Sequence, residues 1–252
     1  MCATLSVGRV MLALLLCVSG LVTAQKKPSS SEQDLVDAVN QERKDRELPI
    51  LKWDEGLARA ARKHAELMAE QKALEHQLPD EPELAARAHD AGARFSHITE
   101  NIGVADWANE FHEGWMHSPG HRANILDPRI DSIGIGVVEG EQRLYAVEDF
   151  ALAVEPLSIE EQQERVGSVL VSRGLKLLNI GDAKKFCDPN EGIVGSRRPG
   201  YLARYETVNI SQLPEDLERQ VHLPRFKSAV VVACPQKESA GFTRFRIIVV
   251  LY

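Results

Sequence analysis

Histidine and serine side chains between residues 112 and 121 are the first candidates for chemistry. His112-Glu113 followed by His117 has the composition of a zinc protease motif, but its histidines are five residues apart. Protease histidines of this kind are four apart on one helical face, whereas five residues turn them about 140° from one another. Ser118 and His121 could suggest a serine hydrolase, yet no Gly-x-Ser-x-Gly turn frames the serine and no third triad member is evident. Neither pattern predicts catalysis.

A short helix is expected to position His121. Proline is favoured at the first position of a helix, and Pro119 places His121 in the first turn of a helix that runs to Leu126. A helix N-terminus disfavours a positive charge, so the imidazole should stay neutral and able to ligate or to accept a hydrogen bond. The alternative is a local capping and packing role for the segment that begins at Ser118.

Helices precede two strands in the first half of the chain, which predicts an α+β layered domain. We expect helices over Glu32–Arg46, from the N-cap Asp54 through Met68, over Pro79–Gly92 and over Asp106–His117, and strands over Ile133–Val138 and Arg143–Phe150. His64 lies on the apolar stripe of the second helix, so we interpret it as a half-buried histidine with a partner rather than a ligand. Gly134 and Gly136 alternate in a strand, where they permit close approach of another backbone.

The second half of the chain is long enough for a second small α+β domain. We expect helices over Ile159–Leu178 and Leu213–Gln220, and strands over Tyr201–Ile210, Ala229–Ala233 and Phe242–Leu251. No motif is identified there, and no internal sequence repeat is visible. The domain boundaries predicted from these patterns are residues 32–154 and 155–252.

The N-terminus has the features of a signal peptide over residues 1–24. Arg9 precedes the apolar run Val10–Val18, which is too short for a membrane span, and small residues precede Gln25. Residues 25–31 then form a flexible leader. No later stretch is long and apolar enough to span a bilayer. We therefore expect a secreted protein, extracellular or periplasmic, with no transmembrane helix in the mature chain.

Charge and cysteine content agree with export. The net charge of −7 and the lack of a basic cluster argue against nucleic acid as a partner. Cys187 and Cys234 remain after removal of the signal peptide, and an even pair in an oxidising compartment predicts a disulfide. Two free thiols are the alternative.

Several short phrases occur in a fixed order over about 120 residues. They are Asn40-Gln-Glu-Arg43, Leu51-Lys-Trp53-Asp54, Leu74-Glu-His76, Glu100-Asn101-Ile102, Ser118-Pro-Gly-His121-Arg-Ala-Asn124-Ile-Leu126 and Asp149-Phe150. This order resembles the CAP superfamily of cysteine-rich secretory, antigen 5 and pathogenesis-related 1 proteins, and its wording is similar to the bacterial SCP branch. The resemblance implies an α-β-α sandwich with a shallow central cleft, and it covers only the first half of the mature chain.

The resemblance also implies a cleft lined by two histidines and two acidic residues. His76 and His121 match the histidines and Glu100 matches the first acid. Ser118 stands where family members often carry the second acid, so the set is incomplete. The implied ligand-binding residues are therefore His76, Glu100, Ser118 and His121.

Two imidazoles and one carboxylate could hold zinc with a water in the fourth position. The metal ligands would then be His76, Glu100 and His121. The alternative is a hydrogen-bonded polar cluster that supports the walls of the cleft, in which the buried carboxylate accepts from neighbouring N–H groups. Because the second acid is missing, we favour the structural cluster over a tight metal site.

Three functions follow from these observations. The first is a secreted binding or scaffold protein whose cleft binds a small ligand, a lipid, a peptide or a divalent ion. Its extracellular ligand or protein partner is still to be identified. The second is a metal-assisted extracellular hydrolase. The third is a cell-envelope interaction protein with a vestigial cleft. We favour the first, and enzyme activity is not expected.

Overall fold

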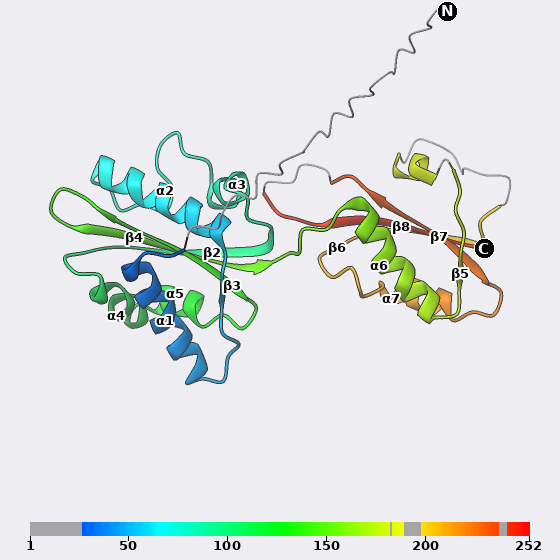
Figure 1. The fold of residues 1–252 in the computed structure, drawn as a ribbon, viewed down its shortest axis with the longest axis horizontal. Helices are drawn as coiled ribbons and strands as arrows, with labels where there is room; N and C mark the ends of the chain where they lie inside the picture. Colours follow the sequence, from blue (N-terminus) through cyan, green and yellow to red (C-terminus); the bar gives the residue numbers. More distant parts are fainter. Residues whose placement is uncertain (1–26, 182, 189–197, 237–240) are drawn as a thin grey trace, which may run out of the picture.

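The structure is a computed structural model that describes residues 27–181, 183–188, 198–236 and 241–252. Two units follow one another along the chain, each built on a four-stranded sheet (Figure 1). The first unit consists of α1 (Ser30–Lys44), β1 (Lys52–Trp53), α2 (Glu55–Gln71), α3 (Leu84–Asp90), β2 (Phe95–Ala105), α4 (Asn109–His117), α5 (Pro119–Ile125), β3 (Ser132–Glu139) and β4 (Leu144–Ala153). The second consists of α6 (Ile159–Ser172), β5 (Lys176–Leu177), the 3-10 turn η1 (Ala183–Cys187), β6 (Tyr201–Thr207), α7 (Glu215–Val221), β7 (Ser228–Cys234) and β8 (Phe245–Leu251).

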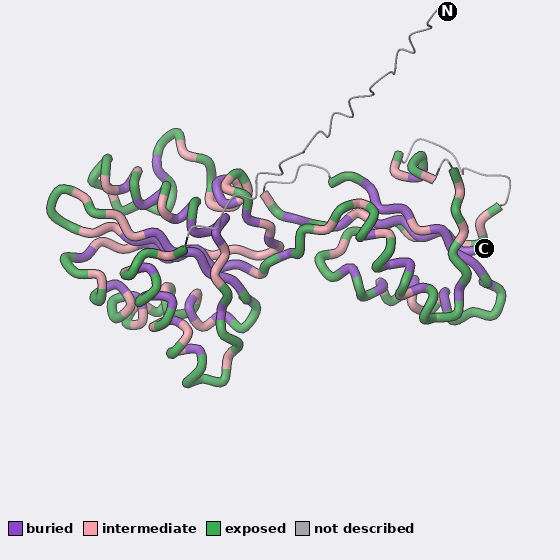
Figure 2. The backbone as a smooth tube through the Cα atoms, in the orientation of Figure 1, coloured by how far each residue is buried: buried purple, intermediate pink, exposed green. Residues whose placement is uncertain are grey.

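The first unit is an α-β-α sandwich, as the sequence predicted. Its sheet has the order β1-β3-β4-β2, with β1 parallel to β3 and the other neighbours antiparallel. Helices α1, α4 and α5 pack on one face through a core that includes Ile133 and Ile135. Helices α2 and α3 cover the other face, and Figures 1 and 2 show the buried strands between the two helical layers.

Two glycines in β3 allow α2 to lie directly on the sheet. A Cβ at Gly134 would lie 2.1 Å from the backbone nitrogen of Ala58, and one at Gly136 would lie 2.3 Å from that of Arg62. Real Cβ atoms do not approach backbone so closely, so any larger residue would push the helix away. The prediction that these glycines permit a close backbone approach is confirmed.

A buried arginine joins α1 to the end of α5. Arg43 is fully buried and donates to the carbonyls of Pro49, Ile125 and Asp127 at 2.8, 2.8 and 2.9 Å. Its guanidinium thereby satisfies carbonyls that a helix C-terminus leaves without partners. Arg43 thereby fixes the end of the short helix that carries His121.

Side chains from α4 and α5 cover the edge strand β2. The indole of Trp115 donates to the Ile102 carbonyl at 2.9 Å, and the Asn124 amide donates to the Glu100 carbonyl at 3.0 Å. An uncovered edge strand would offer these groups to another chain. The Asn124 contact also fixes α5 beside the residue that carries the cleft carboxylate.

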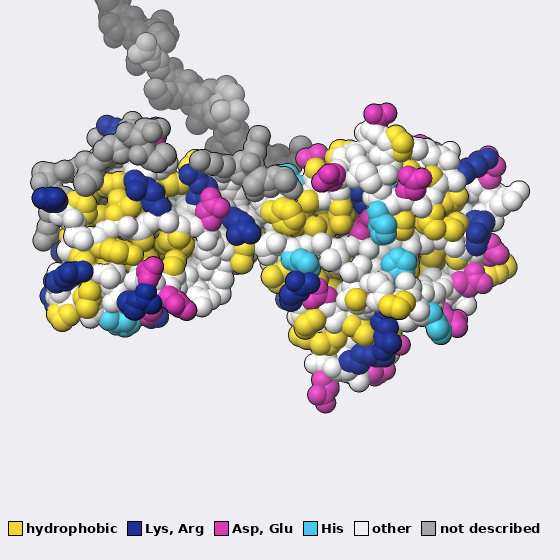
Figure 3. All heavy atoms as spheres, turned by 180° about the vertical axis from the view of Figure 1, so that it is seen from behind, with side chains coloured by type: hydrophobic (Ala, Val, Ile, Leu, Met, Phe, Trp, Pro, Cys, Tyr) yellow, Lys and Arg dark blue, Asp and Glu magenta, His cyan; other side chains and the backbone are white. Residues whose placement is uncertain are grey.

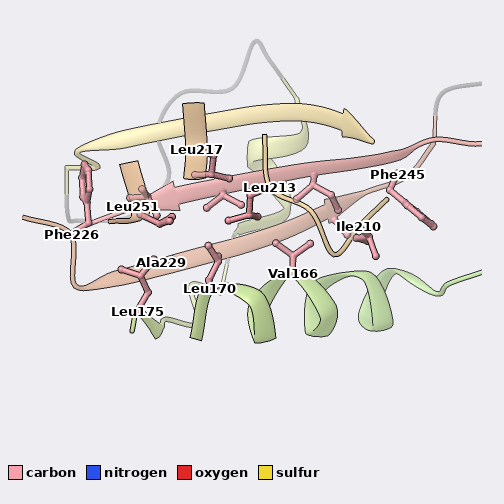
Figure 4. Close-up of a cluster of buried hydrophobic side chains, with 14 of the residues drawn as sticks. Val166, Leu170, Leu175, Ile210, Leu213, Leu217, Phe226, Ala229, Phe245 and Leu251 are labelled. Carbon is pink, nitrogen blue, oxygen red and sulfur yellow. The ribbon is translucent and has the colours of Figure 1, made fainter. Parts of the chain in front are cut away.

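The second unit repeats the strand arrangement of the first. Its order is β5-β7-β8-β6, with β5 parallel to β7 and the other neighbours antiparallel. Helices α6 and α7 cover one face, and Figure 4 shows Val166 and Leu170 of α6 pointing at the strands, with Leu217 of α7 in the same cluster. The turn η1 covers the other face with Phe186. A small α+β domain was predicted here, but the repeat is visible only in the structure.

The predicted disulfide is present between Cys187 and Cys234, with a sulfur–sulfur distance of 2.01 Å. It joins η1 to β7. The expected signal peptide, residues 1–24, lies outside the described residues. Among the residues that are described, no helix is long and apolar enough to cross a membrane.

Helix boundaries differ from the sequence predictions most at the start of α3 and at the end of α6. The third helix was expected from Pro79, but α3 begins at Leu84 because Asp80 has a left-handed φ of 64° and the chain turns there. The helix from Ile159 was expected to reach Leu178, but it ends at Ser172, before Gly174 at φ 85°. Glycine in this conformation commonly ends a helix. Strand β2 was not predicted at all.

Candidate functional site

His76 and Glu100 meet at the surface of the first unit. His76 lies in the loop after α2, and its side chain is 57% exposed. The Glu100 side chain on β2 is only 3% exposed, and its Oε1 lies 2.8 Å from His76 Nδ1. A carboxylate accepts, so the histidine donates through Nδ1–H. The Nε2 atom of His76 is then the ring nitrogen left for a ligand.

The other oxygen of Glu100 is held by a buried arginine on α3. Arg87 Nη2 pairs with Glu100 Oε2, and Nη1 of the same side chain lies 3.4 Å from the His76 carbonyl oxygen. Arg87 is 7% exposed. The guanidinium therefore holds the carboxylate and the loop of its histidine partner together.

More titratable groups lie beneath Glu100. His64 is fully buried; its Nδ1 lies 2.8 Å from Glu81 Oε2, and its Nε2 lies 3.9 Å from Glu100 Oε2. Burial, followed by the Arg87 charge, lowers the pKa of His64. Burial and the adjacent Glu100 raise the pKa of Asp149 well above its usual range, which favours the protonated acid. The partnered histidine predicted at position 64 is present, but it is fully rather than half buried.

His121 lies in the first turn of α5, where the sequence placed it. Its backbone carbonyl accepts from the Asn101 amide at 3.2 Å, and the Asn124 amide donates to the Asn101 side-chain oxygen at 2.9 Å. Burial, followed by the charge of His76, lowers the pKa of His121. This shift favours the neutral ring. Figure 3 shows several histidine side chains exposed on one face of the first unit.

A second buried acid lies below α5. Glu148 on β4 is fully buried and accepts from the Asn101 amide at 3.3 Å. Burial raises the pKa of Glu148 to about 8. Since the Asn101 amide bonds both Glu148 and the His121 carbonyl, this acid supports the first turn of α5, which carries His121.

Ser118 marks the junction of α4 and α5. It ends the first helix and begins the second, its side chain forms no capping hydrogen bond, and its backbone carbonyl accepts from Arg122 at 2.9 Å. Of the four residues expected in the cleft, the structure joins His76 to Glu100 directly, and the charge of His76 contributes to the lowered pKa of His121. Ser118 reaches the site only through its place one turn before His121.

A zinc site with three protein ligands does not fit this arrangement. Both carboxylate oxygens of Glu100 are engaged, one by His76 and one by Arg87. Among the described residues, no three side chains of histidine, cysteine, aspartate or glutamate are placed to hold one metal ion. Two imidazoles remain as nitrogen donors.

Sequence reasoning missed the residues that hold the cleft together. Arg87 belongs to none of the family phrases, and its helix was predicted with the wrong start. A buried arginine is expected wherever several acids converge, but that convergence becomes visible only once β2 and β4 are paired. Asn101 and Asn124 stood inside recognised phrases, and their amides could have been interpreted as connectors of strand to helix.

Comparison with known proteins gives relatives for the first unit. YkwD of Bacillus subtilis (strain 168), an uncharacterised protein, is 32% identical over 118 residues, which is 46% of this chain and 46% of YkwD. The chain therefore spans less than half of that relative. Solved structures that match include an outer surface protein from Borrelia burgdorferi, at 20% identity and a TM-score of 0.47, covering 51% of this chain and 96% of that one. Another is an extracellular SCP-domain protein from Bacillus anthracis, at 28% identity and a TM-score of 0.44, covering 48% and 40%.

The family assignment rests on a contiguous match and on the residues described above. The model of the cysteine-rich secretory protein family, CAP, matches residues 36–151. This range includes His76, His121, Glu100 and the sheet of the first unit up to Ala151 in β4. Residues 36–151 are therefore a CAP domain.

Proposed function

We propose that this chain is a secreted binding protein whose CAP cleft takes a polar group of its ligand between His76 and His121. The observation that carries the proposal is that the two carboxylate oxygens of Glu100 have different partners. Oε1 accepts from His76 Nδ1, and Oε2 accepts from Arg87. The carboxylate therefore orients the ring of His76, and the imidazoles are the groups that contact the ligand.

The orientation has a recognised use in binding sites. A carboxylate that accepts from one ring nitrogen fixes the tautomer and the direction of the imidazole and makes the other nitrogen a better donor of electrons. His76 is more than half exposed and offers that nitrogen to solvent. His121, with its pKa lowered by burial, is neutral and supplies a second nitrogen.

The hydrolase alternative finds less support in the same geometry. Metal-assisted hydrolysis needs a firmly held ion with an open position. Both oxygens of Glu100 already accept from other side chains, and Ser118 stands where a second acid would complete the set. Binding requires only the two imidazoles.

Zinc is a suitable probe because imidazole nitrogens bind it well. Calorimetric titration of the full chain with Zn²⁺ is expected to show one weak site that is lost in His76→Ala and in His121→Ala. His222→Ala, which removes an exposed histidine of the second unit, is the matched control and should bind like the wild type. Unchanged binding in both cleft variants would place the site elsewhere and end the proposal.

We also propose that the protein is exported and processed. The support comes from the N-terminal pattern of residues 1–24 and from the disulfide between Cys187 and Cys234. Mass spectrometry of protein recovered from the culture medium or periplasm should show a chain that begins at Gln25. Recovery of the unprocessed chain from the cytoplasm alone would contradict this.

A further inference from the structure

The shared topology of the two sheets gives each cleft position a counterpart in the second unit. Lys52 and Lys176 occupy the same place: each donates its backbone N–H to the residue before its partner strand, at 2.9 and 3.0 Å. Counted from these two lysines, each residue in the strands of one sheet has a counterpart at the same place in the strand pairing of the other. The strand pair Glu100–Asp149 corresponds to Leu202–Val250.

The counterparts are apolar, so the second unit does not repeat the cleft. Leu202 and Val250 replace the two acids and belong to the cluster beneath η1. Val230 and Val232 replace Gly134 and Gly136, and their side chains occupy the space that the backbone of a helix like α2 would need on that face. The role of the second unit must therefore come from another part of its surface.

The loop between β7 and β8 lies against the CAP domain. The backbone N–H of Thr243 donates to the Phe95 carbonyl at 2.8 Å. The rings of Phe242 and Phe95 pack edge to face with centroids 5.5 Å apart. Gly241 lies so close to α3 that a Cβ there would be 2.2 Å from the Ala85 carbonyl oxygen. The loop thus contacts both the start of β2 and the first turn of α3.

These two elements are the ones that hold the cleft carboxylate. Ala85 lies two residues before Arg87, which pairs with Glu100 and contacts the His76 carbonyl. Phe95 opens the strand that carries Glu100. We infer that residues 241–243 brace α3 and β2 and so position Arg87 against Glu100, making the second unit a support for the cleft. This inference rests on the function proposed above.

Gly241 and Gly174 provide a matched pair of variants for the test. Both have left-handed φ values, +87° and +85°, so alanine strains the backbone equally at either site. Only Gly241 touches the CAP domain, since nothing lies within 4 Å of a Cβ at Gly174. Any effect of Gly241→Ala beyond that of Gly174→Ala therefore reports the contact with α3. Phe242→Ala is a second variant that removes a contact without backbone strain.

Hydrogen exchange of the full-length chain, in the absence of any ligand, measures how strongly residues 241–243 stabilise α3. In Gly241→Ala we expect the amides of α3 to exchange about tenfold faster than in wild type, with Phe242→Ala in the same direction and Gly174→Ala close to wild type. Zn²⁺ affinity should fall several-fold in Gly241→Ala and Phe242→Ala while His76 and His121 are intact. Wild-type exchange in α3 for both loop variants would overturn the brace.

The two ideas fail separately. If wild-type protein binds no Zn²⁺ but α3 loses protection in the loop variants, the brace stands and the proposed binding function does not. If α3 loses protection while Zn²⁺ affinity is unchanged, the loop supports the helix but does not position the cleft, and the inference is wrong. A loss of both in Gly174→Ala would show that strain alone is responsible, which also overturns it.

Discussion

Arg87 pairs with the oxygen of Glu100 that is turned away from His76. Glu100 and Asp149 lie opposite one another in the sheet, and Glu81 approaches Arg87 to 4.0 Å from the loop that leads into α3. The arginine is the cation that allows these acids to converge in a buried place. The arrangement of Glu100 and His76 thus depends on a residue outside the phrases that carry the family resemblance.

Removal of that cation should destabilise the fold strongly. In Arg87→Met, Glu100 keeps a buried charge without its main partner, and breaking such a pair costs about 3–5 kcal/mol. Arg46→Gln, which removes an exposed pair with Glu42 one helical turn away, should change stability by less than about 0.5 kcal/mol. Urea unfolding of both variants measures the difference. Equal midpoints would mean that the buried pair does not hold the fold.

The contact between α2 and β3 predicts opposite effects for two glycine substitutions. Gly134→Ala places a Cβ against the α2 backbone and should cost more than about 3 kcal/mol. Gly114→Ala lies in α4 with nothing within 4 Å and should stabilise by about 0.5–1 kcal/mol, because alanine favours the helix. Thermal unfolding of both variants measures these changes in stability. A Gly134→Ala variant as stable as the wild type would show that α2 can move off the sheet.

Glu148 predicts a dependence of stability on pH. Burial raises its folded-state pKa to about 8 from 4.5. As the pH rises, the unfolded chain releases this proton first, so the stability that is full below about pH 4.5 is lost progressively up to about pH 8. Glu148→Gln cannot ionise and keeps an acceptor for Asn101. The free energy of unfolding of the variant should therefore rise relative to that of the wild type by a few kcal/mol between pH 4.5 and 8.

Denaturant unfolding at several pH values measures this gain. Exposed Glu139→Gln, on the neighbouring strand, is the control and should follow the wild-type curve. A constant difference between Glu148→Gln and wild type across the range would mean that Glu148 is ionised in the folded protein.

Elements with strong local signals were predictable from the sequence. Asp54 caps α2 as expected, with its side chain accepting from the Leu57 N–H at 2.9 Å. Pro119 starts α5, and the hairpin of β3 and β4 has nearly the predicted bounds. In each case the physical cause lies within a few residues of its effect.

Strand β2 could not be predicted in the same way. Its sequence contains His97, Glu100 and Asn101, which depart from the apolar alternation of a half-buried strand. These polar side chains are stable there because distant partners satisfy them, Asp127 for His97 and Arg87 for Glu100. The information that makes this segment a strand therefore lies elsewhere in the chain.

The repeat in the second unit escaped sequence analysis for a related reason. Strand order and register depend on which backbones pair, whereas the side chains at matched positions changed in type, as Glu100 and Leu202 illustrate. The same strand arrangement thus carries polar side chains at these positions in the first unit and apolar side chains in the second. Only the pairing of strands reveals the common arrangement.

The most direct test of the cleft is the tautomer of His76. Long-range ¹H–¹⁵N spectra at a pH where the ring is neutral should show the proton on Nδ1, held by Glu100, and a bare Nε2 directed to solvent. In Glu100→Gln this preference should weaken, because an amide can donate to Nδ1 as well as accept from it. A proton on Nε2 in wild-type protein would contradict the account, since Glu100 would then not orient His76 toward a ligand.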